Sequence, residues 1–69
     1  MGHHLIRATI LSQIINNITK KYNVDENKAL HMFYTSHTGS LFSDDDSGLY
    51  GQSPLYIFSI FEQELKHEG

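Results

Sequence analysis

Residues 5–22, which read LIRATILSQIINNITKKY, decide the fold of this chain. Apolar side chains recur there every three or four residues, and the stretch contains neither glycine nor proline. The apolar stripe consists of Leu5, Ala8, Leu11, Ile15, Ile18 and Tyr22, widened by Ile6, Ile10 and Ile14. The opposite side carries Arg7, Gln13, Asn17, Lys20 and Lys21. This spacing is typical of an amphipathic helix, whereas a half-buried strand would alternate apolar and polar residues.

A second helix is predicted to begin after a short connection. Asn23 can adopt the left-handed conformation that ends a helix, and Asp25 can cap the next one. Glu26 places a carboxylate in the first turn of that helix, where the helix dipole favours it. Its apolar face is supplied by Ala29, Leu30, Met32, Phe33 and Tyr34. We expect the two helices to lie antiparallel, and the second to end near His37, because Gly39 is a favourable terminator.

Residues 38–53 differ in composition from the rest of the chain. They contain three glycines, four serines and three aspartates, so turn-forming residues dominate. This composition predicts an ordered Gly/Ser/Asp-rich loop that includes either one helical turn or a short hairpin around Leu41 to Tyr50. Because the segment also holds Leu41, Phe42, Leu49 and Tyr50, we expect at least two of these side chains to pack onto the core.

The last helix is predicted to begin at Ser53 and Pro54, as N-cap and first helical residue. Its apolar residues are Leu55, Tyr56, Ile57, Phe58, Ile60, Phe61 and Leu65. They extend most of the way round the helix, and a small three-helix domain has little other surface to cover them. The sequence thus predicts an all-α, three-helix domain over residues 1–69, with residues 1–4 as a flexible or tag-like end.

Composition excludes several classes of function. The 69 residues include no cysteine, which excludes disulfides and thiolate metal sites. Five basic residues against eight acidic ones give a net charge of -3, and the basic residues are scattered, so we expect no nucleic-acid binding. No long apolar run or signal-peptide pattern is present, so we expect no membrane interaction and a cytoplasmic location.

The acidic residues 44–46 followed by Gly48 invite comparison with a calcium-binding loop. When Gly48 is placed at the sixth position of such a loop, Ser43 and Pro54 occupy the first and twelfth, where carboxylates are required. A solvated turn with a helix-capping aspartate is therefore the favoured interpretation. Weak binding of a metal ion or small ligand by Asp44, Asp45 and Asp46 remains an alternative.

Histidines and hydroxyl residues do not form a recognisable catalytic pattern. His31 and His37 are six residues apart, which places them on different faces of a helix rather than together on a metal ion. Ser36 and His37 are adjacent, so on a helix their side chains diverge, and the serines and threonines of residues 35–40 are better interpreted as caps. We therefore expect no enzymatic activity, no bound metal and no cofactor.

Aromatic side chains supply the best candidates for a binding site. Most of the eight are needed for the core, but those near or on the last helix can also anchor a protein partner. The candidate contact residues are Tyr50, Tyr56, Phe58 and Phe61. They predict a small protein-interaction module that self-associates or binds a larger partner.

Two segments resemble a group of short bacterial proteins classed as domains of unknown function. They are Val24-Asp25-Glu26-Asn27-Lys28-Ala29-Leu30, which opens the second helix, and Leu49-Tyr50-Gly51-Gln52-Ser53-Pro54, which precedes the last. The resemblance implies a helical protein without established catalytic residues, sometimes encoded near toxin-like genes. An antitoxin-like regulatory subunit is accordingly an alternative function.

Overall fold

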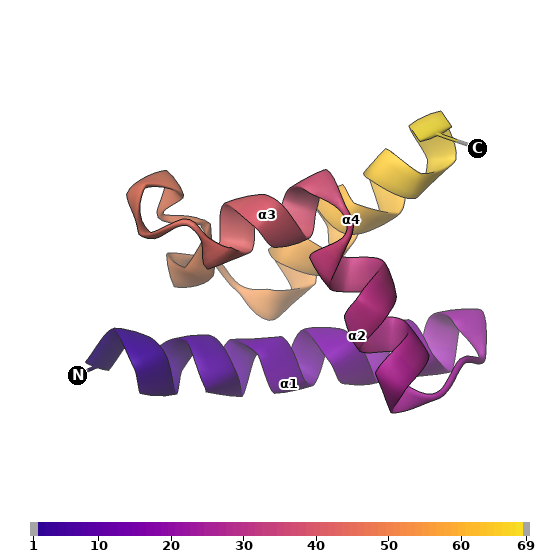
Figure 1. Ribbon diagram of the computed structural model, residues 1–69, viewed down its shortest axis with the longest axis horizontal. Helices are drawn as coiled ribbons and strands as arrows, with labels where there is room; N and C mark the ends of the chain where they lie inside the picture. Colours follow the sequence, from indigo (N-terminus) through magenta and orange to yellow (C-terminus); the bar gives the residue numbers. More distant parts are fainter. Residues whose placement is uncertain (1, 69) are drawn as a thin grey trace.

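The computed structural model describes the backbone of residues 2–68 and the side chains of residues 8–67. Within residues 2–68 the chain forms four α-helices and two short 3-10 helices, which confirms the all-α class (Figure 1). The helices are α1 (Gly2–Tyr22), α2 (Glu26–Tyr34), α3 (His37–Ser43) and α4 (Pro54–Glu68), and the 3-10 helices are η1 (Asp45–Ser47) and η2 (Leu49–Gly51). The predicted count of three helices is wrong, because α3 occupies much of the predicted loop. The side chains of residues 1–4, predicted to be a flexible or tag-like end, lie outside this description.

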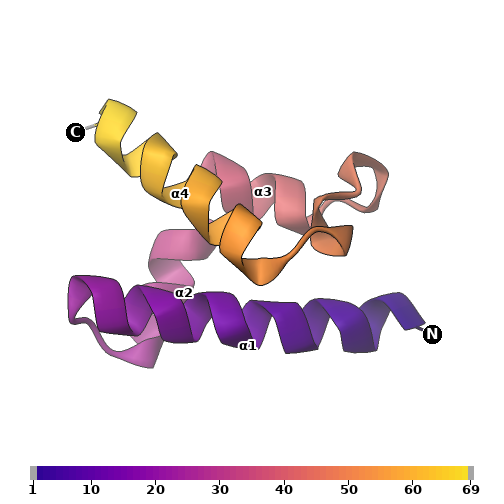
Figure 2. The same cartoon turned by 180° about the vertical axis from the view of Figure 1, so that it is seen from behind.

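Helix α1 runs along the long dimension of a molecule that measures 35 × 22 × 18 Å (Figure 1). Helix α2 packs against the C-terminal half of α1 and leads away from it to α3. Helix α4 lies against both α1 and α3, as the view from behind shows (Figure 2). The result is a two-layer arrangement in which α1 forms one layer and α3 with α4 the other, and α2 connects them.

The core lies where all four α-helices meet. It consists of Ile14, Ile15, Ile18, Ala29, Phe33, Phe42, Leu49, Ile57 and Phe61. Phe33 is at its centre, with ring centroids 5.5 Å from Phe42 and 5.8 Å from Phe61. The rings meet edge-on or tilted, which is the arrangement that aromatic quadrupoles favour.

The connection between α1 and α2 agrees with the sequence prediction. Asn23 has a φ of 55°, in the left-handed region that ends a helix. The Asp25 carboxylate then accepts a hydrogen bond of 2.7 Å from the backbone N–H of Lys28, which satisfies a donor in the first turn of α2. Local hydrogen bonding therefore determines this turn.

The end of α2 differs from the prediction. The helix ends at Tyr34 rather than near His37, because Ser36 caps a new helix by accepting a hydrogen bond of 2.9 Å from Gly39 N–H. Gly39 lies inside α3 and is buried, so it does not terminate a helix. A Cβ atom at this position would lie 1.9 Å from the carbonyl oxygen of Phe33. The glycine is required because the backbones of α2 and α3 touch there.

Residues 44–53 contain two short 3-10 helices joined by non-helical residues, where the sequence predicts a loop with one helical turn or a short hairpin. Gly48, with a φ of 70°, separates η1 from η2, and Leu49 in η2 is buried in the core. Phe42 of α3 is fully buried as well. The expectation that apolar residues of this segment pack onto the core is thus confirmed, although the backbone that carries them is helical.

Helix α4 begins at Pro54, as predicted, and the Ser53 hydroxyl accepts a hydrogen bond of 3.2 Å from Tyr56 N–H. Most of its apolar surface is covered, because α1 packs on one side and α3 on another. The large apolar residues of α4 that stay exposed are Leu55 and Tyr56, at 72% and 51%. The unpredicted helix α3 therefore covers apolar residues of α4 that would be exposed in a three-helix domain.

Glu64 of α4 holds the first turn of α3. One carboxylate oxygen accepts hydrogen bonds from Thr38 N–H at 2.9 Å and from the Thr38 hydroxyl at 2.7 Å. The other oxygen accepts a hydrogen bond of 2.6 Å from His37 N–H. Burial alone would raise the pKa of Glu64, but the hydrogen bonds from Thr38 and His37, together with the charge of His37, lower it below its ordinary value of 4.5.

Replacing this carboxylate by an amide is expected to destabilise the protein. In Glu64→Gln, an NH2 group would face one of the backbone N–H donors that the carboxylate now satisfies. We expect the free energy of unfolding to fall by about 1–2 kcal/mol, measured by urea denaturation at pH 7. The control is Glu62→Gln, which removes a surface ion pair with Lys21 (3.3 Å) and should cost less than about 1 kcal/mol.

The pH dependence of stability provides a second measure of the same contact. Because the pKa of Glu64 is lower in the folded state, the unfolded chain binds the proton more tightly below pH 4.5. The stabilisation that Glu64 provides is therefore complete above the pKa that it has in the unfolded chain. It is lost as the pH falls through the lower pKa that it has in the folded state. Glu64→Gln should flatten this part of the acid profile, and an unchanged profile would contradict the assigned role.

Candidate functional site

Between Ala8 and Thr19, the outer face of α1 is polar but carries no charge. Between Ala8 and Thr19 the sequence contains no acidic or basic residue, and charges resume only at Lys20. The uncharged face of α1 is defined here as Thr9, Ser12, Gln13, Asn16 and Asn17, of which the first four are exposed and the last is partly exposed. Depletion of charge is a feature of the centre of protein interfaces rather than of ordinary solvated surface.

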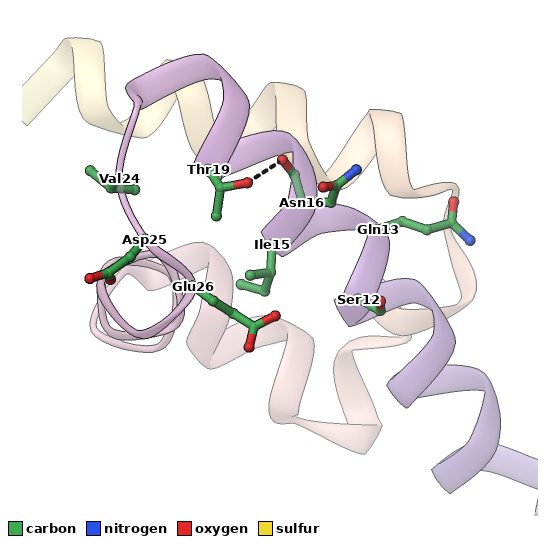
Figure 3. Close-up of a pocket in the computed structure, with 8 residues that line it drawn as sticks. All are labelled: Ser12, Gln13, Ile15, Asn16, Thr19, Val24, Asp25 and Glu26. Atoms are coloured by element: carbon green, nitrogen blue, oxygen red, sulfur yellow. Dashed lines mark hydrogen bonds between the residues drawn. The ribbon is translucent and has the colours of Figure 1, made fainter.

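A polar groove lies along one side of this face, between α1 and the start of α2 (Figure 3). It is open to solvent and has a volume of about 500 Å³. Its lining residues are Ser12, Gln13, Ile15, Asn16, Thr19, Val24, Asp25 and Glu26. Figure 3 shows the Glu26 carboxylate directed towards α1, whereas the Gln13 carboxamide points away from α2.

The chemistry of the polar groove is that of hydrogen bonding. The Thr19 hydroxyl donates a hydrogen bond of 2.8 Å to the carbonyl oxygen of Asn16, and Asp25 is used as the cap of α2. Of the described residues that line this groove, none is a histidine that could serve as a base for Ser12. The amide, hydroxyl and carboxylate groups are suited to binding polar groups of another molecule.

A second groove lies on the other side of the uncharged face and is called here the Leu55 groove. It has a volume of about 360 Å³ and runs between α1 and the first turn of α4. Its lining residues are Gln13, Asn16, Asn17, Ser53, Pro54 and Leu55. Leu55 combines a position beside this groove with a side chain that is 72% exposed.

A third, smaller hollow of about 210 Å³ lies between α1 and α2. Ala8, Leu11, Ile15 and Leu30 give it an apolar character, and Ser12 and Glu26 add polar groups. It shares Ser12 with the polar groove, so the hollows on this side of α1 are contiguous.

The four aromatic residues predicted to contact a partner do not form one surface. Phe61 is fully buried in the core against Phe33, so its assignment as a partner contact is corrected to a core role. Phe58 and Tyr50 are half-buried and pack against the core cluster. Only Tyr56 of the four is exposed, at 51%.

Leu55 and the uncharged face were missed as candidates. The absence of charge between residues 8 and 19 is visible in the sequence and could have pointed to an interface. Leu55 could not be distinguished from its apolar neighbours, because its exposure depends on how α1 and α3 pack around α4.

The acidic segment is a solvated turn with a capping aspartate, as favoured from the sequence. Asp44 ends α3 and its carboxylate accepts a hydrogen bond of 3.0 Å from Asp46 N–H. No group of three residues suited to hold a metal ion occurs in the part of the chain that the structure describes. His37, expected near the end of α2, instead begins α3, while His31 is exposed on α2.

Comparison with known proteins finds no family model, no curated protein and no solved structure that matches this chain. Among the described residues, no helix combines the length and the apolar character that crossing a membrane requires.

Proposed function

We propose that this protein is a non-catalytic protein-interaction module whose docking surface combines the uncharged face of α1 with Leu55. The observation that carries the proposal is the 72% exposure of Leu55 beside a groove lined by amide side chains. Burying a leucine side chain stabilises a complex by about 1.5–3 kcal/mol, so this residue is suited to anchor a partner.

The polar residues around Leu55 support a protein ligand. Gln13, Asn16 and Asn17 carry carboxamides, and each carboxamide can donate and accept hydrogen bonds. A partner can therefore place polar groups of either kind on this face without leaving a buried charge unpaired. Tyr56, the next residue of α4, is also exposed, and its hydroxyl tolerates a solvated rim.

Site-specific crosslinking tests the proposal. A photoreactive amino acid at Gln13 or Leu55 should give protein adducts in cells that express the chain, several-fold more than the same group at the exposed control position Lys28 on α2. The identity of the adduct separates a larger partner, including an enzyme held by a regulatory subunit, from a second copy. Equal yields at all three positions, or no adducts at Gln13 and Leu55, would exclude this docking surface.

A further inference from the structure

The uncharged face of α1 has the pattern required for pairing with itself. We propose that its partner is a second copy of this chain, held by antiparallel contact of two α1 helices about a two-fold axis at Gln13. This inference rests on the proposed function, because it names the partner of the same surface.

Symmetry makes the absence of charge informative. In a two-fold contact, a residue at the axis meets the same residue of the second copy, so a charged residue there would meet an identical charge. The chain has a net charge of -3, so two copies already repel each other, and the contact itself must add no like-charge pairs. The stretch from Ala8 to Thr19 meets this requirement.

The spacing of the polar residues fits an antiparallel pair. Thr9, Gln13 and Asn17 are four residues apart, so they lie on one side of α1, with Thr9 and Asn17 equidistant from Gln13. Antiparallel pairing places Thr9 opposite Asn17 of the second copy. It also places the two Gln13 carboxamides together, where each can donate to the other's oxygen.

The Leu55 groove provides the space for the second helix. Gln13 and Asn17 form part of its lining on α1, and Leu55 forms its other edge. A second α1 lying in this groove would cover the exposed Leu55 side chain, and the symmetry repeats that contact in the other copy.

The basic residues nearest the axis lie just outside the uncharged stretch. Arg7 is six residues from the axis and Lys20 is seven, so antiparallel pairing places Arg7 of one copy within about 2 Å of Lys20 of the other, measured along the helices. Salt screens the repulsion between these two residues, so raising the ionic strength should tighten the dimer.

Charge substitution at the axis tests the arrangement. Sedimentation equilibrium of the wild-type chain should show a monomer–dimer equilibrium. Gln13→Glu and Gln13→Lys should each weaken the dimer by about tenfold or more, because each variant brings two like charges together. An equimolar mixture of the two variants should restore association as a heterodimer.

Matched controls separate this effect from a general change of charge. Gln63→Glu and Gln63→Lys make the same changes at an exposed position of α4 outside the Leu55 groove, and dimerisation should be unaffected. Circular dichroism should show the same helix content in all four variants, since Gln, Glu and Lys have similar helix propensities.

The outcomes distinguish this inference from the proposed function. A strict monomer at every concentration, a mixture that does not associate, or equal effects at Gln63 would overturn the second-copy proposal. If adducts to a different protein still form at Gln13 and Leu55, the docking surface stands with another partner. If neither dimer nor adduct is found, both proposals fail.

Discussion

Gly39→Ala is expected to lower the free energy of unfolding by about 3 kcal/mol or more, although alanine is the better helix former. In a solvated helix this change would stabilise by about 1 kcal/mol. In α3, however, the new Cβ would lie 1.9 Å from the carbonyl oxygen and 2.7 Å from the carbonyl carbon of Phe33. Both atoms belong to the backbone of α2, so they can move only if the two helices separate.

A loss of about 3 kcal/mol in the free energy of unfolding is large for so small a chain. Domains are stabilised by roughly 0.05–0.15 kcal/mol per residue, which corresponds to about 3–10 kcal/mol for a chain of this length. Urea denaturation followed by circular dichroism measures the change, and thermal unfolding should show a lower Tm. The control is Gly51→Ala, where the added Cβ meets nothing within 4 Å.

Gly51→Ala should leave stability unchanged or raise it by up to about 1 kcal/mol, because the substitution restricts the unfolded chain. The decisive comparison is the sign of the change in the free energy of unfolding, which should be a loss for Gly39→Ala and no loss for Gly51→Ala. If Gly39→Ala were as stable as Gly51→Ala, the close contact between α2 and α3 would be refuted.

Phe33→Ala is expected to cost about 3–5 kcal/mol, because it removes the ring at the centre of the core and leaves a cavity. Phe33 is fully buried, and its ring contacts those of Phe42 and Phe61, which belong to α3 and α4. Losing it therefore weakens the attachment of three helices to one another. The free energy of unfolding in urea provides the measurement.

The neighbouring residue is the matched control for Phe33. Tyr34 is 47% exposed and contacts the same ring edge-on, with centroids 5.8 Å apart. Tyr34→Ala removes a large aromatic side chain from the same helix, but it should cost only about 0.5–1.5 kcal/mol. Comparable losses for the two variants would show that Phe33 does not occupy the centre of the core.

Features that depend on local hydrogen bonds could be predicted from the sequence. The cap at Asp25, the left-handed Asn23 and the start of α4 at Pro54 each follow from residues within a few positions of one another. The length and apolar spacing of α1 were predictable for the same reason, since its period is that of the helix itself.

Helix α3 could not be predicted, because distant residues stabilise it. Seven residues are too few for an isolated helix, and its composition favours turns. Its first turn is held by Glu64, and its glycine packs on Phe33. Neither contact leaves a periodic pattern in the sequence.

The candidate site was only partly predictable for a related reason. The sequence indicates that α4 is apolar on most sides, but which side chains are covered depends on α3. Phe61 was therefore assigned to a partner although it is in the core, and Leu55 was not singled out. Tyr56 is the candidate of the four whose side chain is more exposed than buried.

The contact between Glu64 and the first turn of α3 has a consequence for the order of folding. It joins residues 37 and 38 to a residue 26 or 27 positions later in the chain. During synthesis, α1 and α2 emerge from the ribosome before Glu64 does. The first turn of α3 therefore lacks this hydrogen-bond acceptor until Glu64 has emerged as well. The four-helix structure is therefore completed only once α4 has been synthesised, and α3 is the helix whose formation is coupled to the arrival of α4.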